Sequence, residues 1–74
     1  MGVPENEEYL KQLGDKIRKV RMRKKITQTE LANLCEFEKS NLARIEAGGT
    51  NPTIKTLKKI ADALGVKVSK LIDF

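Results

Sequence analysis

Apolar residues recur at steps of three and four along most of this chain, and nowhere do they alternate with polar residues over a strand-length run. The stretch from Leu57 to Leu64 is the strongest example, with further apolar side chains at Ile60 and Ala61. Steps of three and four place side chains on one face of an α-helix, whereas alternation is typical of a half-buried strand. The sequence therefore predicts an all-α fold without a sheet, and its 74 residues allow one small domain.

Capping residues and glycines divide this pattern into five expected helices. The sequence Thr-Gln-Thr-Glu has the form of a capping box, in which Thr27 and Glu30 satisfy each other's backbone amides at a helix start. Gly48 and Gly49 stop the helix that comes next, and Gly65 stops the one after it. The expected helices cover about residues 6–24, 27–35, 38–47, 53–64 and 68–73. Residues 1–5 are expected to form a flexible leader to a single domain of residues 6–74.

The apolar faces of these helices are expected to meet in one core. Phe37 is expected to turn inward as an apolar plug at the corner of residues 36–38. The other residues assigned to the core are Leu10, Leu13, Ile17, Val20, Leu31, Ala32, Leu34, Cys35, Leu42, Ile45, Ile54, Leu57, Ile60, Ala61 and Leu64.

Composition excludes several kinds of chemistry. The chain has no histidine and one cysteine, Cys35, so a disulfide framework, a Cys/His zinc site and a His-assisted nucleophile are all excluded. We expect no cofactor, no metal and no enzymatic activity. No apolar run approaches the ~20 residues of a membrane span, and a lone thiol suits a reducing cytoplasm. The formal net charge is +5, and seven of the ten residues from Lys16 to Lys25 are Lys or Arg, which makes a polyanionic partner plausible.

The expected third helix has a polar, small-sided face opposite its apolar one. At 100° per residue, Leu42, Ile45 and Glu46 share the inner side. The outer side and its flanks carry short residues and hydrogen-bond donors, which suit close approach to base edges in a DNA major groove. These residues are Lys39, Ser40, Asn41, Ala43 and Arg44. Composition alone does not separate this interpretation from a merely solvated helix face.

Several short motifs occur together in a fixed order. They are Gly14, IRKVR (residues 17–21), ITQTELA (26–32), SNLARIEAG (40–48), NPT (51–53) and LKKIADALGV (57–66). In this order and spacing, the chain from about Leu13 to Leu71 resembles the lambda-repressor-like helix-turn-helix family, the XRE/Cro type of prokaryotic DNA-binding domain. The resemblance implies a five-helix domain whose second and third helices form the helix-turn-helix.

The resemblance also implies residue roles. In the third helix, Lys39, Ser40, Asn41 and Arg44 match the family's base-contacting positions and positions near them. The residues that match phosphate-binding positions are Thr27, Gln28, Gly49, Thr50 and Asn51. For Thr27, the capping role has equal support. Arg21 and Glu46 match a pair that the family uses as an internal salt bridge, in keeping with the inward position of Glu46 on the helical wheel.

Two residues depart from the family pattern at the corner between the second and third helices. Glu36 stands where the family usually has a glycine in the left-handed region, a conformation that costs a non-glycine residue ~1–2 kcal/mol. Glu38 stands where Ser or Thr usually caps the third helix. Both acids are expected near the DNA-facing surface, where they repel phosphate.

The sequence thus predicts a sequence-specific, cytoplasmic transcriptional regulator that binds double-stranded DNA. One domain this small reads few base pairs, so a homodimer on a palindromic operator is expected, with half-sites ~34 Å apart. Leu71, Ile72 and Phe74 are candidates for its seam. The alternative, in which Leu71 completes the monomer core, has equal support. The alternative function is a helical protein-interaction module, such as an antitoxin or a coactivator domain.

Overall fold

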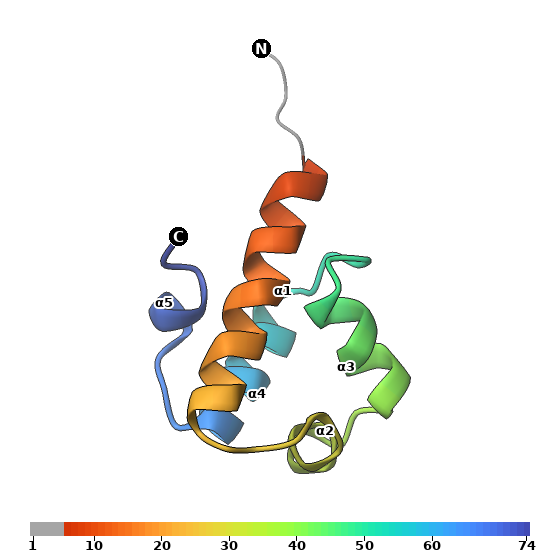
Figure 1. Ribbon diagram of the computed structural model, residues 1–74, viewed down its shortest axis with the longest axis vertical. Helices are drawn as coiled ribbons and strands as arrows, with labels where there is room; N and C mark the ends of the chain where they lie inside the picture. Colours follow the sequence, from red (N-terminus) through yellow and green to blue (C-terminus); the bar gives the residue numbers. More distant parts are fainter. Residues whose placement is uncertain (1–5) are drawn as a thin grey trace.

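The computed structural model describes residues 6–74, so the expected leader at residues 1–5 lies outside the described part of the chain. Within residues 6–74 the structure has five helices and no strand, which confirms the predicted fold class (Figure 1). The helices are α1 (Asn6–Arg23), α2 (Gln28–Cys35), α3 (Lys39–Glu46), α4 (Ile54–Leu64) and α5 (Val68–Leu71).

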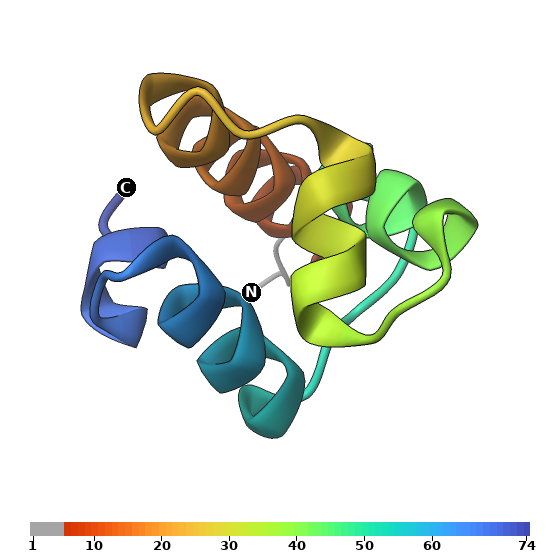
Figure 2. The ribbon, with the colours of Figure 1, turned by 90° about the horizontal axis from the view of Figure 1, so that it is seen from below.

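The helices pack around one core. α1, the longest, packs against α3 and α5, while α2 packs against α3 and α4. The two ribbon views place α3 and α5 at opposite edges of the molecule (Figures 1 and 2). The buried apolar residues are Leu13, Ile17, Val20, Leu31, Ala32, Cys35, Leu42, Ile45, Leu57, Ile60, Ala61, Leu64 and Leu71. Leu71 is fully buried, so it completes the core of the monomer.

Three of the expected core residues lie outside the core: Leu10 is half-buried, and Leu34 and Ile54 are exposed. Leu34 in α2 is 61% exposed, and Ile54 in α4 is 69% exposed. The buried side of α2 is formed by Leu31, Ala32 and Cys35, and Leu34 lies about 100° or more from the middle of that side. Ile54 is the first residue of α4, and its side chain lies outside the core that the later turns of the helix help to form.

Local hydrogen bonds explain where α2 begins and how it ends. The Thr27 hydroxyl oxygen accepts from the Glu30 amide at 3.1 Å, and the Thr27 amide donates to Glu30 Oε1 at 2.7 Å, so the capping box is complete. Glu36 follows α2 with φ 59° and ψ 38°, which is the left-handed region that its position predicts. The next amide, from Phe37, donates to the Ala32 carbonyl at 2.8 Å and closes the turn.

Lys59 of α4 contacts the strained corner between α2 and α3, and the sequence did not predict this contact. Its Nζ lies 5.6 Å from the centre of the Phe37 ring and 3.4 Å from the carbonyl oxygen of Cys35, at the end of α2. A cation there interacts favourably with both the ring face and the negative end of the helix dipole. Phe37 is half-buried against the core, in agreement with its expected inward position.

Gly14 allows α1 and α3 to approach main chain to main chain. A Cβ atom at this position would lie 2.4 Å from the carbonyl oxygen of Glu46 and 2.5 Å from that of Ile45. Neither oxygen belongs to a flexible side chain, so any larger residue would force the two helices apart. The Gly14 contact therefore fixes the C-terminal end of α3 against α1.

Candidate nucleic-acid interface

The outward face of α3 is polar and accessible. Lys39, Ser40, Asn41 and Arg44 are exposed, and Ala43 is half-buried. The opposite face, formed by Leu42, Ile45 and Glu46, is buried. This division agrees with the helical wheel and leaves no large apolar side chain on the outer surface of α3. Glu38 precedes the helix as its N-cap residue, but its side chain makes no capping hydrogen bond.

Arg21 and Glu46 form a buried ion pair between α1 and α3. Arg21 Nε donates to Glu46 Oε2 at 2.7 Å, and Nη2 donates to Oε1 at 3.1 Å. The side chains are only 12% and 3% exposed, respectively. Arg21 Nη1 also donates to the carbonyl oxygen of Ile26 at 2.9 Å, which ties down the linker ahead of α2. The Arg21 guanidinium thus joins α1, the linker and α3, and its two bonds to the Glu46 carboxylate are bidentate and charge-assisted.

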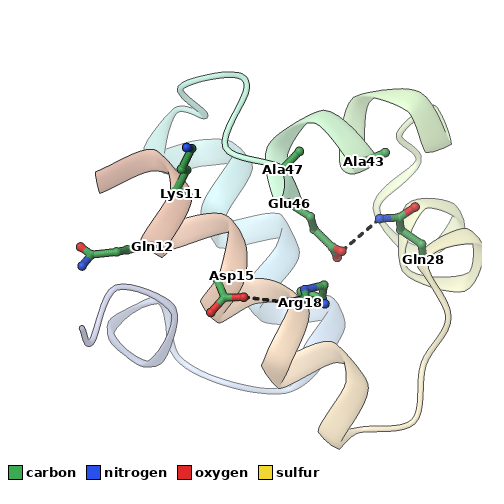
Figure 3. A pocket seen from close by; sticks show the side chains of 8 residues that line it. All are labelled: Lys11, Gln12, Asp15, Arg18, Gln28, Ala43, Glu46 and Ala47. Carbon is green, nitrogen blue, oxygen red and sulfur yellow. Dashed lines mark hydrogen bonds and ion pairs between the residues drawn. The ribbon is translucent and has the colours of Figure 1, made fainter. Parts of the chain in front are cut away.

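Gln28, the first residue of α2, also bonds to this carboxylate. Its Nε2 donates to Glu46 Oε1 at 3.0 Å (Figure 3). The sequence assigned Gln28 to phosphate and did not predict this contact, because the two residues are 18 positions apart and the bond depends on how α2 and α3 pack. The bond uses one of the two amide hydrogens of Gln28 and leaves the other available at the N-terminus of α2, where an anion is favoured.

An open hollow of about 600 Å³ lies between α1 and α3, next to the outward face of α3 (Figure 3). It is lined by Lys11, Gln12, Asp15, Arg18, Gln28, Ala43, Glu46 and Ala47. Sequence reasoning did not select the α1 residues of this set, although Lys11, Asp15 and Arg18 recur at steps of four and three and so share one face of α1. This polar stripe is the sequence signal from which these α1 residues could have been predicted.

Asp15, one of the two acids that line this hollow, is held in its charged form. Asp15 accepts from Arg18 Nη2 at 2.8 Å, and Lys19 Nζ lies 3.1 Å from its other oxygen. The hydrogen bond from Arg18, followed by that from Lys19, lowers the pKa of the Asp15 carboxyl below its usual value. Asp15 therefore stays ionised at neutral pH, and its charge is matched by the two neighbouring cations.

The loop after α3 forms the other flank of this surface. Gly49 and Asn51 are exposed, and Thr50 is half-buried. The Gly49 amide, predicted to approach phosphate, donates to the Arg44 carbonyl at 2.9 Å, so it also ends α3. A smaller cavity of about 160 Å³ separates this loop from α3. Its walls are Phe37, Asn41, Arg44, Ile45, Thr50, Pro52 and Thr56.

The described residues contain neither a membrane-spanning helix nor a metal-binding cluster of side chains. No helix within residues 6–74 is long and apolar enough to span a membrane. In the same part of the chain, no group of three or more His, Cys, Asp or Glu side chains is arranged to hold a metal ion.

A helix-turn-helix family model matches residues 17–71, which includes α2, α3 and the corner between them. The chain belongs to the helix-turn-helix family. This membership confirms the lambda-repressor-like, XRE/Cro-type resemblance of the sequence. Members of this family are DNA-binding transcriptional regulators, and the same function applies to this chain in preference to a helical protein-interaction module.

Individual relatives agree with this membership. The chain is 38% identical over 60 residues to the immunity repressor protein of Bacillus phage phi105, covering 81% of this chain and 42% of that repressor. It is 36% identical over 62 residues to the control protein C.BamHI of Bacillus amyloliquefaciens, covering 82% of this chain and 76% of the relative. The chain thus spans less than half the length of the phage repressor, but most of the control protein.

A solved structure has the same fold. The restriction-modification controller protein C.AhdI from Aeromonas hydrophila matches with a TM-score of 0.82 and 29% sequence identity. The match covers 84% of this chain and 94% of the controller protein. The helix-turn-helix unit and the helices around it are therefore arranged as in this controller protein.

Proposed function

We propose that this chain regulates transcription by binding a specific operator, with α3 in the major groove of double-stranded DNA. The observation that carries the proposal is the division of α3 into a buried face and an exposed face of short residues and hydrogen-bond donors. An α-helix fits the major groove, and short side chains let it approach the base edges closely.

The proposed base contacts follow from the donors on α3. Arg44 donates two hydrogen bonds to a guanine, Asn41 pairs with an adenine, and Ala43 contacts a thymine methyl group. Lys39 and Ser40 supply further donors at the start of the helix. The proposed phosphate contacts lie on both flanks of α3 and come from Thr27, Gln28, Thr50 and Asn51. The Gly49 amide is already bonded to the Arg44 carbonyl, so Gly49 is proposed only to let the loop backbone approach the phosphate closely. The Thr27 hydroxyl oxygen accepts from Glu30, so its hydrogen is free to be donated to a phosphate.

We also propose that the chain acts as a homodimer on a palindrome. Leu71 is buried in the monomer, so Ile72 and Phe74, which are 48% and 51% exposed, remain for the seam. The Phe74 ring lies 6.2 Å from the ring of Tyr9, another exposed residue, so the apolar surface continues onto α1. Because α5 and α3 lie at opposite edges of the molecule, a seam at the C-terminus leaves α3 free for DNA (Figure 1). The proposal includes a cytoplasmic location and no catalytic role.

This function is tested by selecting bound duplexes from a random pool, once with the wild-type protein and once with the Arg44→Ala variant. Loss of the Arg44 fork should relax the preference at one base pair of each half-site, with ~1–3 kcal/mol of discrimination lost. Lys70→Ala, which removes an exposed cation from α5, serves as a control and should leave the selected sequence unchanged. If Arg44→Ala weakens binding uniformly across all sequences, Arg44 binds phosphate and does not read bases.

The salt dependence of binding tests the role of DNA itself. Phosphate-driven binding should weaken steeply with salt, with a log–log slope of about −0.9 for each neutralised phosphate. Binding to a protein partner through the apolar C-terminal surface should change much less, because apolar contacts are not screened. A flat salt response together with capture of a protein partner would support the protein-interaction module.

A further inference from the structure

Among the described residues predicted to bind phosphate, Gln28 is distinguished by a side-chain hydrogen bond to α3. Its Nε2 lies 3.0 Å from Glu46 Oε1. Gln28 is the first residue of α2, and Glu46 is the last residue of α3. The bond therefore connects the N-terminal end of α2, where an anion is favoured, to the C-terminal end of the helix proposed to read bases (Figure 3).

The two ends of α3 are held in different ways. Its N-terminal end is fixed by the short corner from α2, which Phe37 closes through its bond to the Ala32 carbonyl. Its C-terminal end is fixed by the main-chain contact at Gly14 and by the Glu46 carboxylate, which accepts two bonds from Arg21 and one from Gln28. Loss of the Gln28 bond leaves both Arg21 bonds in place. It therefore weakens the attachment of α3 to α2 without leaving the buried Glu46 charge unpaired.

We propose that Gln28 is a positioning residue for base recognition. It donates one amide hydrogen to Glu46 and the other to a DNA phosphate, and so sets the tilt of α3 relative to the backbone that it binds. This inference rests on the proposed function and deepens it. Arg44 lies only two residues from Glu46, and base contacts tolerate displacements of only about 0.5 Å or 10–20°. A looser C-terminal end of α3 therefore reduces discrimination between bases as well as affinity.

The DNA test compares Gln28→Ala with Asn51→Ala, a control variant at another proposed phosphate contact. Each variant is titrated with the duplex selected by the wild-type protein and with a duplex changed at the base pair that Arg44 reads. For Gln28→Ala, the ratio of the two affinities should fall by about tenfold, within the range of one base contact. For Asn51→Ala, both affinities should fall by the same factor. Equal losses on both duplexes for Gln28→Ala would overturn the inference and make Gln28 a plain phosphate contact.

A second measurement uses the free protein. In a two-dimensional amide NMR spectrum, Gln28→Ala should shift the backbone signals from Ala43 to Ala47, at the end of α3. The signals from Ile60 to Leu64, in α4, should stay in place and show that the fold is intact. Unchanged α3 signals would contradict the positioning role. A wild-type protein that selects no duplex would instead contradict the proposed function, and the NMR result would still decide whether Gln28 positions α3.

Discussion

Arg21 Nε lies 2.7 Å from Glu46 Oε2, and this pair joins the last turn of α1 to the last residue of α3. The two side chains are 12% and 3% exposed, so water screens their charges only weakly. Glu46 also belongs to the buried face of α3. The same carboxylate thus serves the fold and the placement of the proposed DNA-binding surface.

Glu46→Ala should therefore destabilise the whole domain. It strands the Arg21 guanidinium in a largely buried site, and breaking such a pair costs ~3–5 kcal/mol. Urea unfolding measures the loss. The control is Asp62→Ala, which breaks the exposed Lys58–Asp62 pair and should cost less than about 1 kcal/mol. An unchanged melting temperature for Glu46→Ala, with DNA binding abolished, would show that Glu46 acts in recognition alone.

Glu36→Gly should stabilise the protein. Glu36 has φ 59°, and glycine relieves the ~1–2 kcal/mol that this conformation costs other residues. Glycine also raises the entropy of the unfolded chain, at a cost of about 0.5–1 kcal/mol, so the net gain is up to ~1.5 kcal/mol. Glu36→Ala removes the same charge but keeps the strain, and it should show no comparable gain in chemical unfolding. Equal stability of the two variants would mean that the corner is relaxed.

Cys35 should make the stability fall at alkaline pH. Its side chain is 2% exposed, and burial raises the pKa of the thiol, with a smaller opposing effect from the Lys59 cation. The thiol pKa is higher in the folded protein than in the unfolded chain, where it is about 8.5. Below the unfolded pKa the neutral thiol stabilises the folded state fully, and this stabilisation is lost as the pH rises toward the folded pKa. Unfolding free energies measured between neutral and alkaline pH should fall more for the wild type than for Cys35→Ala. Parallel curves would show that the buried thiol does not contribute.

Two substitutions near the C-terminus should have separate effects, one on folding and the other on dimerisation. Leu71→Ala removes a fully buried side chain and should cost ~2–5 kcal/mol of stability. Phe74→Ser changes a half-exposed side chain at the proposed seam, so it should weaken dimerisation by about tenfold or more while stability changes little. Sedimentation and thermal unfolding measure the two effects. A Phe74→Ser protein that still dimerises like the wild type would place the seam elsewhere.

The sequence predicted the helices well because their signals are local. The Thr27–Glu30 capping box and Gly65 each act within one turn of a helix, and both occur in the structure. The left-handed backbone at Glu36 also agreed with expectation. The same conformation at Lys25, with φ 60°, was missed because no glycine or asparagine marks that position.

Features that depend on packing between helices were harder to predict. Periodicity gives the direction of an apolar face but not the extent of its neighbours, which is why Ile54 was wrongly placed in the core. Leu34 was wrongly placed because it lies off the buried side of α2. For the candidate site, the sequence and the family resemblance brought Arg21 and Glu46 together. They did not predict the bond from Gln28, because it depends on the angle between α2 and α3.

Gly14 has a mechanical consequence for the proposed recognition of DNA. Bare peptide groups of α1 and α3 meet there, so the junction contains no compressible side chain and acts as a hard stop. Pressure from a bound duplex cannot drive α3 inward against α1. Accommodation must then come from bending of the DNA and from long, exposed side chains such as Lys39 and Arg44. The protein thus presents a stiff template, and the deformability of each candidate operator becomes part of what it selects.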